Sequence, residues 1–109
     1  MESIRRLFWW VLVGSKGGPT RMQILMLLRQ GPANANQIAV KLNLNYKTVQ
    51  HHLKVLEENR MIVPEGERYN VTYRLSPELL DNIDILDSII ESISSSKGVD
   101  KNLGAALDS

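Results

Sequence analysis

The chain contains no cysteine among its 109 residues. Disulfide bridges, thiolate metal sites and cysteine nucleophiles are therefore excluded. Histidine is scarce as well, because His51 and His52 are the only two and they are adjacent. Neighbouring side chains on a helix point about 100° apart, which makes this pair a poor site for one metal ion. We expect neither a metal nor a cofactor.

Acidic residues are missing from the segment 19–54, which carries five basic residues and a net charge of +5. The segment 77–109 has seven acidic residues against two lysines, a net charge of −5, although the whole chain carries only +1. A basic segment suits contact with phosphates, and an acidic one does not. The alternative is that the five basic residues form only a solvated face.

No apolar run approaches the length of about 20 residues that a membrane-spanning helix needs. Arg5 and Arg6 precede the apolar run 7–13, as in a secretory signal peptide, but the segment 14–18 is a poor cleavage site. We therefore expect a cytoplasmic protein with no membrane partner.

Patterns of catalytic residues are missing too. Gly17 and Gly18 precede a helix but lack the rest of a phosphate-binding loop. Asp81, Asp84 and Asp87 recur every three residues and fit the solvated face of a helix. We expect a protein that is not an enzyme.

Apolar residues recur at helical spacing in five segments, for which we expect helices over residues 3–13, 19–30, 35–42, 46–59 and 77–94. Pro19 and Pro77 suit the first turn of a helix, and Asn34 or Asn36 and then Asn45 suit a helix cap. A short apolar run at 61–64 and alternating residues at 69–75 predict a hairpin closed by a turn at 65–68.

The predicted fold is mainly α with a small β-hairpin: a winged helix-turn-helix with additional N- and C-terminal helices. We divide the chain into an N-terminal apolar helix with a flexible linker (1–18) and a winged helix-turn-helix DNA-binding domain (19–76). A C-terminal dimerisation helix (77–96) and a disordered tail (97–109) complete the division.

The helix over 46–59 is the predicted recognition helix, since the major groove of DNA admits one α-helix. Its side chains outside the apolar face can contact base edges and phosphates. The residues expected to bind DNA are Arg21, Asn45, Tyr46, Lys47, Thr48, Gln50, His51, Lys54 and Arg68. Arg21, Thr48 and Arg68 are expected at the DNA backbone. Glu65 and Glu67 flank Arg68 and oppose phosphate contact, which leaves the role of the wing open.

The first and last helices carry more apolar surface than a small core needs, and such surface usually marks an interface. In the last helix, apolar residues follow the four-three spacing of a heptad seam. We expect a homodimer that uses Ile4, Leu7, Phe8, Val11, Leu79, Ile83, Leu86, Ile90 and Ile93. The alternative is that the seam packs on its own domain.

Four further side chains have competing interpretations. His52 is expected to pack partly inside with a hydrogen bond to the backbone, whereas His51 is expected to face DNA. Trp9 and Trp10 favour a core or interface position over the wall of a ligand pocket.

The run 45–57, with the sequence NYKTVQHHLKVLE, resembles the recognition helix of ArsR-type winged-helix regulators. The segment 20–25 resembles the opening of that family's preceding helix, and 73–76 the end of its wing, so the resemblance covers about residues 19–79. It implies a homodimeric repressor that binds near-palindromic operators in double-stranded DNA. Many members sense metals through cysteines, or through Asp and His in the last helix. This chain lacks those cysteines and has no histidine there, so metal sensing is not carried over, and the chain resembles the archaeal and bacterial members without such ligands.

Two alternatives to a sequence-specific regulator stay open. The chain could be a winged-helix protein–protein interaction module without specific DNA binding, because a fold does not fix a function. It could also bind DNA as an architectural protein with weak sequence preference.

Overall fold

The computed structural model describes residues 2–96, so the tail expected over 97–109 lies outside the described residues. Helix α1 (Glu2–Trp9) continues into a π-helical turn, η1 (Trp10–Gly14), and is followed by α2 (Gly18–Leu28), α3 (Ala35–Leu42) and α4 (Tyr46–Glu58). A hairpin of β1 (Ile62–Glu65) and β2 (Thr72–Leu75) precedes α5 (Pro77–Asp81) and α6 (Ile83–Ser96). The predicted fold class is confirmed.

Side-chain caps set the limits of the two helices of the helix-turn-helix. Asn34 and Gln37 form a capping box at the start of α3: the amide of Gln37 donates to Asn34 Oδ1 at 2.7 Å, and the amide of Asn34 donates to Gln37 Oε1 at 2.8 Å. Helix α3 ends at Asn43, whose φ of 56° is left-handed. At the start of α4, Asn45 Oδ1 accepts a hydrogen bond of 2.8 Å from the amide of Lys47.

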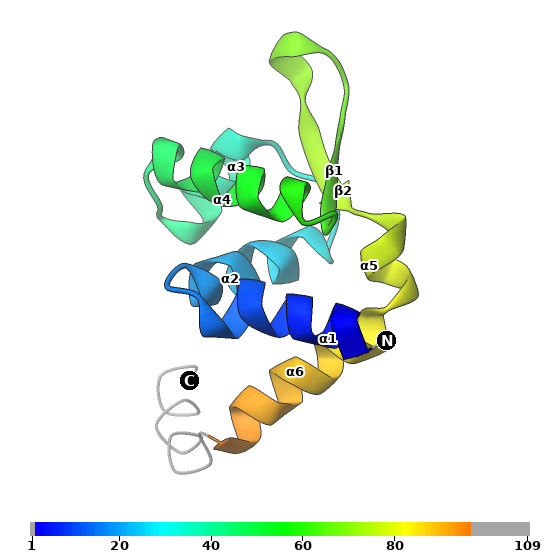
Figure 1. Cartoon of the computed structure of the whole chain (residues 1–109). Helices are drawn as coiled ribbons and strands as arrows, with labels where there is room; N and C mark the ends of the chain where they lie inside the picture. The colour runs from blue at the N-terminus through cyan, green and yellow to red at the C-terminus, as the bar shows by residue number, and fades with distance from the viewer. Residues whose placement is uncertain (1, 97–109) are drawn as a thin grey trace.

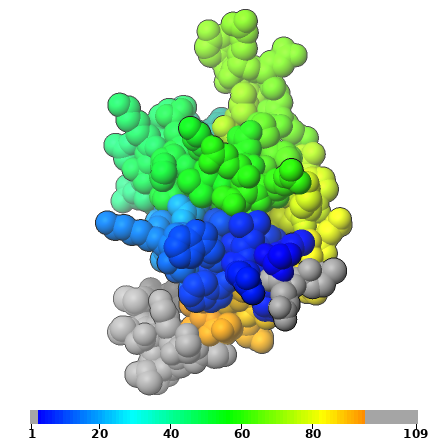
Figure 2. Space-filling model, viewed as in Figure 1, coloured from blue at the N-terminus to red at the C-terminus, as the bar shows by residue number. Residues whose placement is uncertain are grey.

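The hairpin is antiparallel, with Ile62 opposite Leu75 and Glu65 opposite Thr72. Two backbone hydrogen bonds, of 2.8 and 3.2 Å, also join Tyr73 to Ala33, the residue before the cap of α3. The base of the hairpin is therefore tied to the helix-turn-helix. Its tip projects beyond the helices at the top of Figure 1 and stands clear of the helical body in Figure 2. This projection is the wing.

One apolar core collects side chains from every helix and from the base of the hairpin. Its fully buried members include Leu12, Ile24, Leu25, Ile38, Val49, Leu53, Leu56, Met61, Ile62, Leu79 and Leu86. The predicted domain boundaries stay predictions, but the first and last helices share this core with the segment between them.

The segment 14–18, expected to be a flexible linker, is packed instead. The amide of Gly18 donates to the carbonyl oxygen of Ser15 at 3.0 Å. Gly18 itself is buried, and a Cβ atom on it would lie 2.5 Å from the carbonyl oxygen of Leu12. Glycine is needed here for close approach of the backbone, which the sequence analysis mistook for flexibility.

The last predicted helix is not continuous, because it breaks at Asn82 between α5 and α6. Asn82 has φ −120° and ψ 28°, and its side-chain amide donates to the carbonyl oxygen of Glu78 at 2.9 Å. An asparagine side chain that bonds to the backbone in this way competes with helical hydrogen bonds. The straight seam expected over 79–93 is therefore wrong.

Four residues expected at a dimer interface are buried within the protomer: Phe8, Val11, Leu79 and Leu86. Ile4, Ile83, Ile90 and Ile93 are partly buried against the same core, and Leu7 is exposed. The seam therefore packs largely on its own domain, because α1 contacts α6 within one chain. Trp9 and Trp10 are 51% and 60% exposed, so they are surface residues and not core.

The second strand is shorter than predicted. Tyr69 was expected to alternate inward with Val71 and Tyr73, but it belongs to a short 3₁₀ turn, η2 (Arg68–Asn70), and is 93% exposed. Arg68 adopts a φ of 48° in this turn. Since that left-handed conformation ends the extended backbone, the strand begins only at Thr72.

Candidate nucleic-acid interface

Helix α4 separates its side chains into a buried and an exposed face, as its spacing predicts. Val49, Leu53 and Leu56 are buried in the core. The polar residues on the remaining positions are all exposed: Tyr46, Lys47, Thr48, Gln50, His51 and Lys54. A rigid helix thus presents donors, acceptors and two lysines to the outside.

The turn between α3 and α4 places the amino-terminal end of α4 at the surface. Asn45 is exposed there, and its side chain is engaged with the amide of Lys47. The helix dipole makes this end favourable for an anion, because unpaired amides and partial positive charge gather at it. Asn45 therefore acts first as a cap, and it can contact DNA only in addition to that role.

The lysines of α4 keep their charge available. The ion pairs among residues 2–96 join Arg29 to Asp87 at 2.6 Å and Arg74 to Glu65 at 2.8 Å. Neither pair involves Lys47 or Lys54. Partners outside this part of the chain can therefore interact with both lysine side chains without breaking an internal ion pair.

A groove of about 330 Å³ lies between α4, the start of α3 and the wing. Gln50 and Tyr46 line it from α4, and Arg68 and Tyr69 from the wing tip. The structure thus brings together α4 and Arg68, which the sequence analysis selected separately. Four polar residues that line the groove were not predicted from the sequence to do so: Asn34, Asn36, Tyr69 and Tyr73. Tyr69 carries no sequence signal of this position, because it follows the alternation of the strand.

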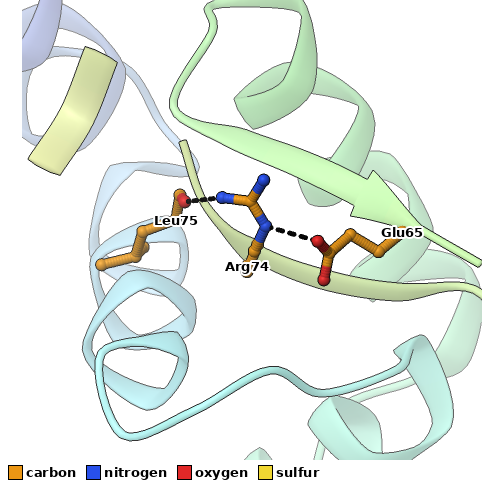
Figure 3. A network of polar contacts seen from close by, with 3 residues as sticks. All are labelled: Glu65, Arg74 and Leu75. Carbon is orange, nitrogen blue, oxygen red and sulfur yellow. Dashed lines mark hydrogen bonds and ion pairs between the residues drawn. The ribbon is translucent and has the colours of Figure 1, made fainter. Parts of the chain in front are cut away.

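The charge of Glu65 in the wing is compensated. Its Oε2 accepts a hydrogen bond of 2.8 Å from Arg74 Nε on the neighbouring strand (Figure 3). Arg74 Nη1 also donates to the carbonyl oxygen of Leu75 at 3.3 Å, which holds the guanidinium along the hairpin. Since Glu65 is paired, Glu67 remains as the carboxylate beside Arg68 that would oppose a phosphate.

The structure corrects the expectation that Arg21 contacts the DNA backbone. Arg21 is only 5% exposed, and its guanidinium is directed inward. Its Nε donates to the carbonyl oxygen of Val11 at 3.0 Å, Nη1 donates to His52 Nδ1 at 3.1 Å, and Nη2 donates to Ser15 Oγ. Burial lowers the pKa of Arg21 from its ordinary value. An arginine held in this way is structural.

His52 is buried, as expected, with 8% of its surface exposed. Its hydrogen-bond partner is the side chain of Arg21, whereas the sequence analysis expected the backbone. Burial lowers the pKa of His52, and the positive charge of Arg21 and the neighbouring His51 lower it further. His52 is therefore neutral near pH 7, while His51 is exposed on the outer face.

Residues 2–96 contain neither a cluster of metal-binding side chains nor a membrane-spanning helix. No three or more histidine or carboxylate side chains in this range come together in a way that could hold a metal ion. Over residues 2–96, no helix combines the length and the apolar character that crossing a membrane requires.

Comparison with known proteins agrees with the geometry of this site. Residues 18–62 match the sequence profile of the bacterial regulatory proteins of the arsR family. The chain is 31% identical over 64 residues to the transcriptional repressor SdpR of Bacillus subtilis (strain 168). The aligned residues cover 59% of this chain and 71% of that protein. The chain belongs to the ArsR family of winged helix-turn-helix transcriptional regulators, which is not a family of enzymes.

Solved structures with the same fold are similar to this chain over more residues than the family profile matches. A homodimeric winged helix-turn-helix DNA-binding domain from Mycobacterium bovis, described as a possible ArsR-family regulator, is 22% identical. It has a TM-score of 0.62 and covers 81% of this chain and 79% of its own. A probable transcriptional regulator from Pseudomonas aeruginosa is 17% identical, with a TM-score of 0.69, and covers 98% of this chain and 87% of its own. At this identity the likeness concerns the fold.

Proposed function

We propose that the chain is a homodimeric repressor that binds double-stranded DNA sequence-specifically with α4 in the major groove. The observation that carries this proposal is the outer face of α4, where Lys47, Gln50 and Lys54 are exposed and neither lysine forms an ion pair with another residue of the segment 2–96. Lysine can neutralise phosphate or donate to guanine, and glutamine can pair with adenine through two hydrogen bonds.

The groove beside α4 supports a second contact from the wing. Arg68 and Gln50 line the same groove, so a duplex seated on α4 also meets the wing tip. Arg68 would contact a phosphate or the minor groove there, as the wing stands clear of the helices (Figure 2). Thr48 and Tyr46 would donate their hydroxyl groups to backbone oxygens.

The surfaces of α1 and α6 that stay exposed in the protomer are suited to a two-fold dimer. Leu7 and Trp10 are exposed on the first helical segment, and Leu80 on α5 is 50% exposed. Arg5 and Arg6 make α1 basic, while α6 is acidic, so α1 of one copy complements α6 of the other. A dimer would place two recognition helices about 34 Å apart, one turn of DNA.

The exposed tryptophans favour one alternative, a protein-interaction module. Trp9 at the end of α1 and Trp10 at the start of η1 are both exposed, and tryptophan is enriched where proteins associate. Such a module does not need the duplex, so binding of DNA by the purified chain separates the two functions.

The test is selection of bound fragments from genomic DNA, followed by titration of one selected duplex at several salt concentrations. The proposal expects affinity to fall steeply with salt, and Lys54→Ala should lower the salt slope by about one unit for each subunit, which is about two units for the dimer. The matched control is Arg29→Ala, which removes the same charge at the C-cap of α2, where Arg29 is paired with Asp87 of α6, and it should leave the slope unchanged. Equal slopes for both variants remove Lys54 from the interface, and no binding at low salt favours the interaction module.

A further inference from the structure

A buried polar junction joins the N-terminal helical segment to the recognition helix. Arg21 of α2 lies at its centre and donates to the Val11 carbonyl of η1, to Ser15 in the following loop and to His52 of α4. We propose that His52 is a proton-sensitive latch: neutral His52 holds α4 against α2 and η1, and its protonation releases α4 and weakens DNA binding. This inference rests on the proposed function and adds a regulation to it.

The junction requires a neutral imidazole. His52 Nδ1 accepts from Arg21 only while it carries a lone pair, with the proton of the ring on Nε2. A protonated imidazole has donors alone, so the hydrogen bond would be replaced by two cations 3.1 Å apart in a buried site. The contact therefore has to open when His52 gains a proton.

The groups around His52 do not compensate a positive charge. The charged or titratable groups that act on it are Arg21 from α2 and His51 from its own helix, and both oppose protonation. From η1 and the loop, the junction receives a neutral carbonyl and the hydroxyl of Ser15. No carboxylate acts on His52 within the described residues, and the pKa of His52 is lowered accordingly.

The junction has little spare room on the side that faces Gly17. A Cβ atom on Gly17 would lie 2.5 Å from Arg21 Nη1 and 2.6 Å from His52 Cε1. The residues adjacent to His52 in α4 are the exposed His51 and the buried Leu53, and Gln50 and Lys54 are two positions away. A shift of His52 therefore shifts the turn of helix that carries the proposed base contacts.

His51 provides an internal contrast, because a positive charge on its side chain should affect DNA binding in the opposite direction. It is exposed on the outer face of α4, where an added positive charge favours phosphate. Its ring lies edge-on to that of His52 with the centroids 5.2 Å apart. Acidification should thus strengthen DNA binding through His51 and weaken it through His52.

The first experiment measures affinity for a selected duplex at constant salt from about pH 8 to about pH 5, a range that includes the ordinary pKa of histidine, about 6.5. Since linked sites typically couple by about 5- to 150-fold, we expect affinity to fall by about 5-fold or more across this range. His52→Asn, whose amide oxygen can accept from Arg21 without titrating, should not show the fall. His51→Asn should make the fall steeper. An equal fall in wild type and His52→Asn overturns the proposal.

The second experiment needs no DNA, and it separates failure of the latch from failure of the proposed function. Because the pKa of His52 is lowered in the folded chain, its stabilising effect is present above the unfolded pKa and is lost as pH falls through the folded one. NMR titration of the His52 imidazole should show it gaining its proton below the ordinary pKa of histidine, about 6.5, with a parallel loss of stability to urea that His52→Asn lacks. A His52 that titrates at its ordinary pKa or above overturns the latch even if no duplex binds. A loss of stability without loss of affinity in a chain that binds DNA shows that the junction is structural only and overturns the regulation.

Discussion

Replacement of Arg21 by methionine removes a buried guanidinium that connects α2 to η1, to the loop after η1 and to α4. The side chain makes hydrogen bonds to Val11, His52 and Ser15, and the methionine retains only its apolar stem. His52 Nδ1 then loses its partner, while the Val11 carbonyl can still accept from Ser15 Oγ, which lies 3.3 Å away. The substitution thus isolates the polar contribution of Arg21 to the fold.

The expected magnitude follows from these contacts. A hydrogen bond from a charged donor contributes about 1.5–3 kcal/mol, so three of them give about 5–9 kcal/mol before any cost is subtracted. Methionine avoids the desolvation of a guanidinium, which costs several kcal/mol. The net loss of unfolding free energy should be about 2–4 kcal/mol, a large part of the total of about 5–15 kcal/mol for a domain.

Urea denaturation at one fixed protein concentration measures this loss, since association would otherwise shift the midpoint. At an m-value of about 2 kcal/mol/M, the midpoint should fall by about 1–2 M. Arg21→Lys keeps the charge and should lie between wild type and Arg21→Met. The control Arg29→Met breaks only an exposed ion pair with Asp87, worth about 0–1 kcal/mol. If Arg21→Met costs no more than Arg29→Met, the structural role of Arg21 is refuted.

Three further predictions concern specificity, a helix cap and assembly. Gln50→Ala should relax sequence preference at one base pair of each half-site, by about 1–3 kcal/mol, and leave the others unchanged in a competition assay with single-base variants of the selected site. Asn34→Ala should cost about 1 kcal/mol in urea denaturation, because it removes one half of the capping box with Gln37; a change below the error of the midpoint would contradict that role. Leu7→Glu should shift sedimentation from dimer to monomer with the helical content unchanged, since Leu7 is exposed in the protomer, and an unchanged mass would remove α1 from the proposed interface.

The local structure of the helix-turn-helix could be predicted because its signals are local. Asn45 was expected as a cap, and Asn34 was one of two candidates with Asn36; Asn34 and Asn45 each accept a hydrogen bond from an amide two or three residues later. The outer face of α4 followed from the positions of Val49 and Leu53, which fix the buried side of the helix. Neither inference needed knowledge of a distant contact.

Arg21 was wrongly expected at the DNA because its positive charge was considered without regard to which face of α2 it occupies. Arg21 shares spacings of three, four and seven residues with Ile24, Leu25 and Leu28, and all of them are buried. That spacing places Arg21 on the buried face of α2. Its partner His52 lies 31 residues away, and no local pattern identifies such a contact.

The proposed interface was overstated for a different reason. The spacing of Leu79, Leu86 and Ile90 shows that one side of a segment is apolar, but it does not show which surface covers that side. Here α1 covers part of α6 within the same chain, and the break at Asn82 changes the direction of the segment. Trp9 and Trp10, which are among the apolar residues that remain exposed, lie outside that seam.

The most direct test of the central claim is an NMR titration of the isotope-labelled chain with a selected duplex. The account predicts that amide shifts concentrate at residues 45–54 of the α4 region and at Arg68 and Tyr69 of the wing, with α6 little affected. Shifts confined to α1 and α6, or no shifts at low salt, would contradict a DNA-binding role for the exposed face of α4.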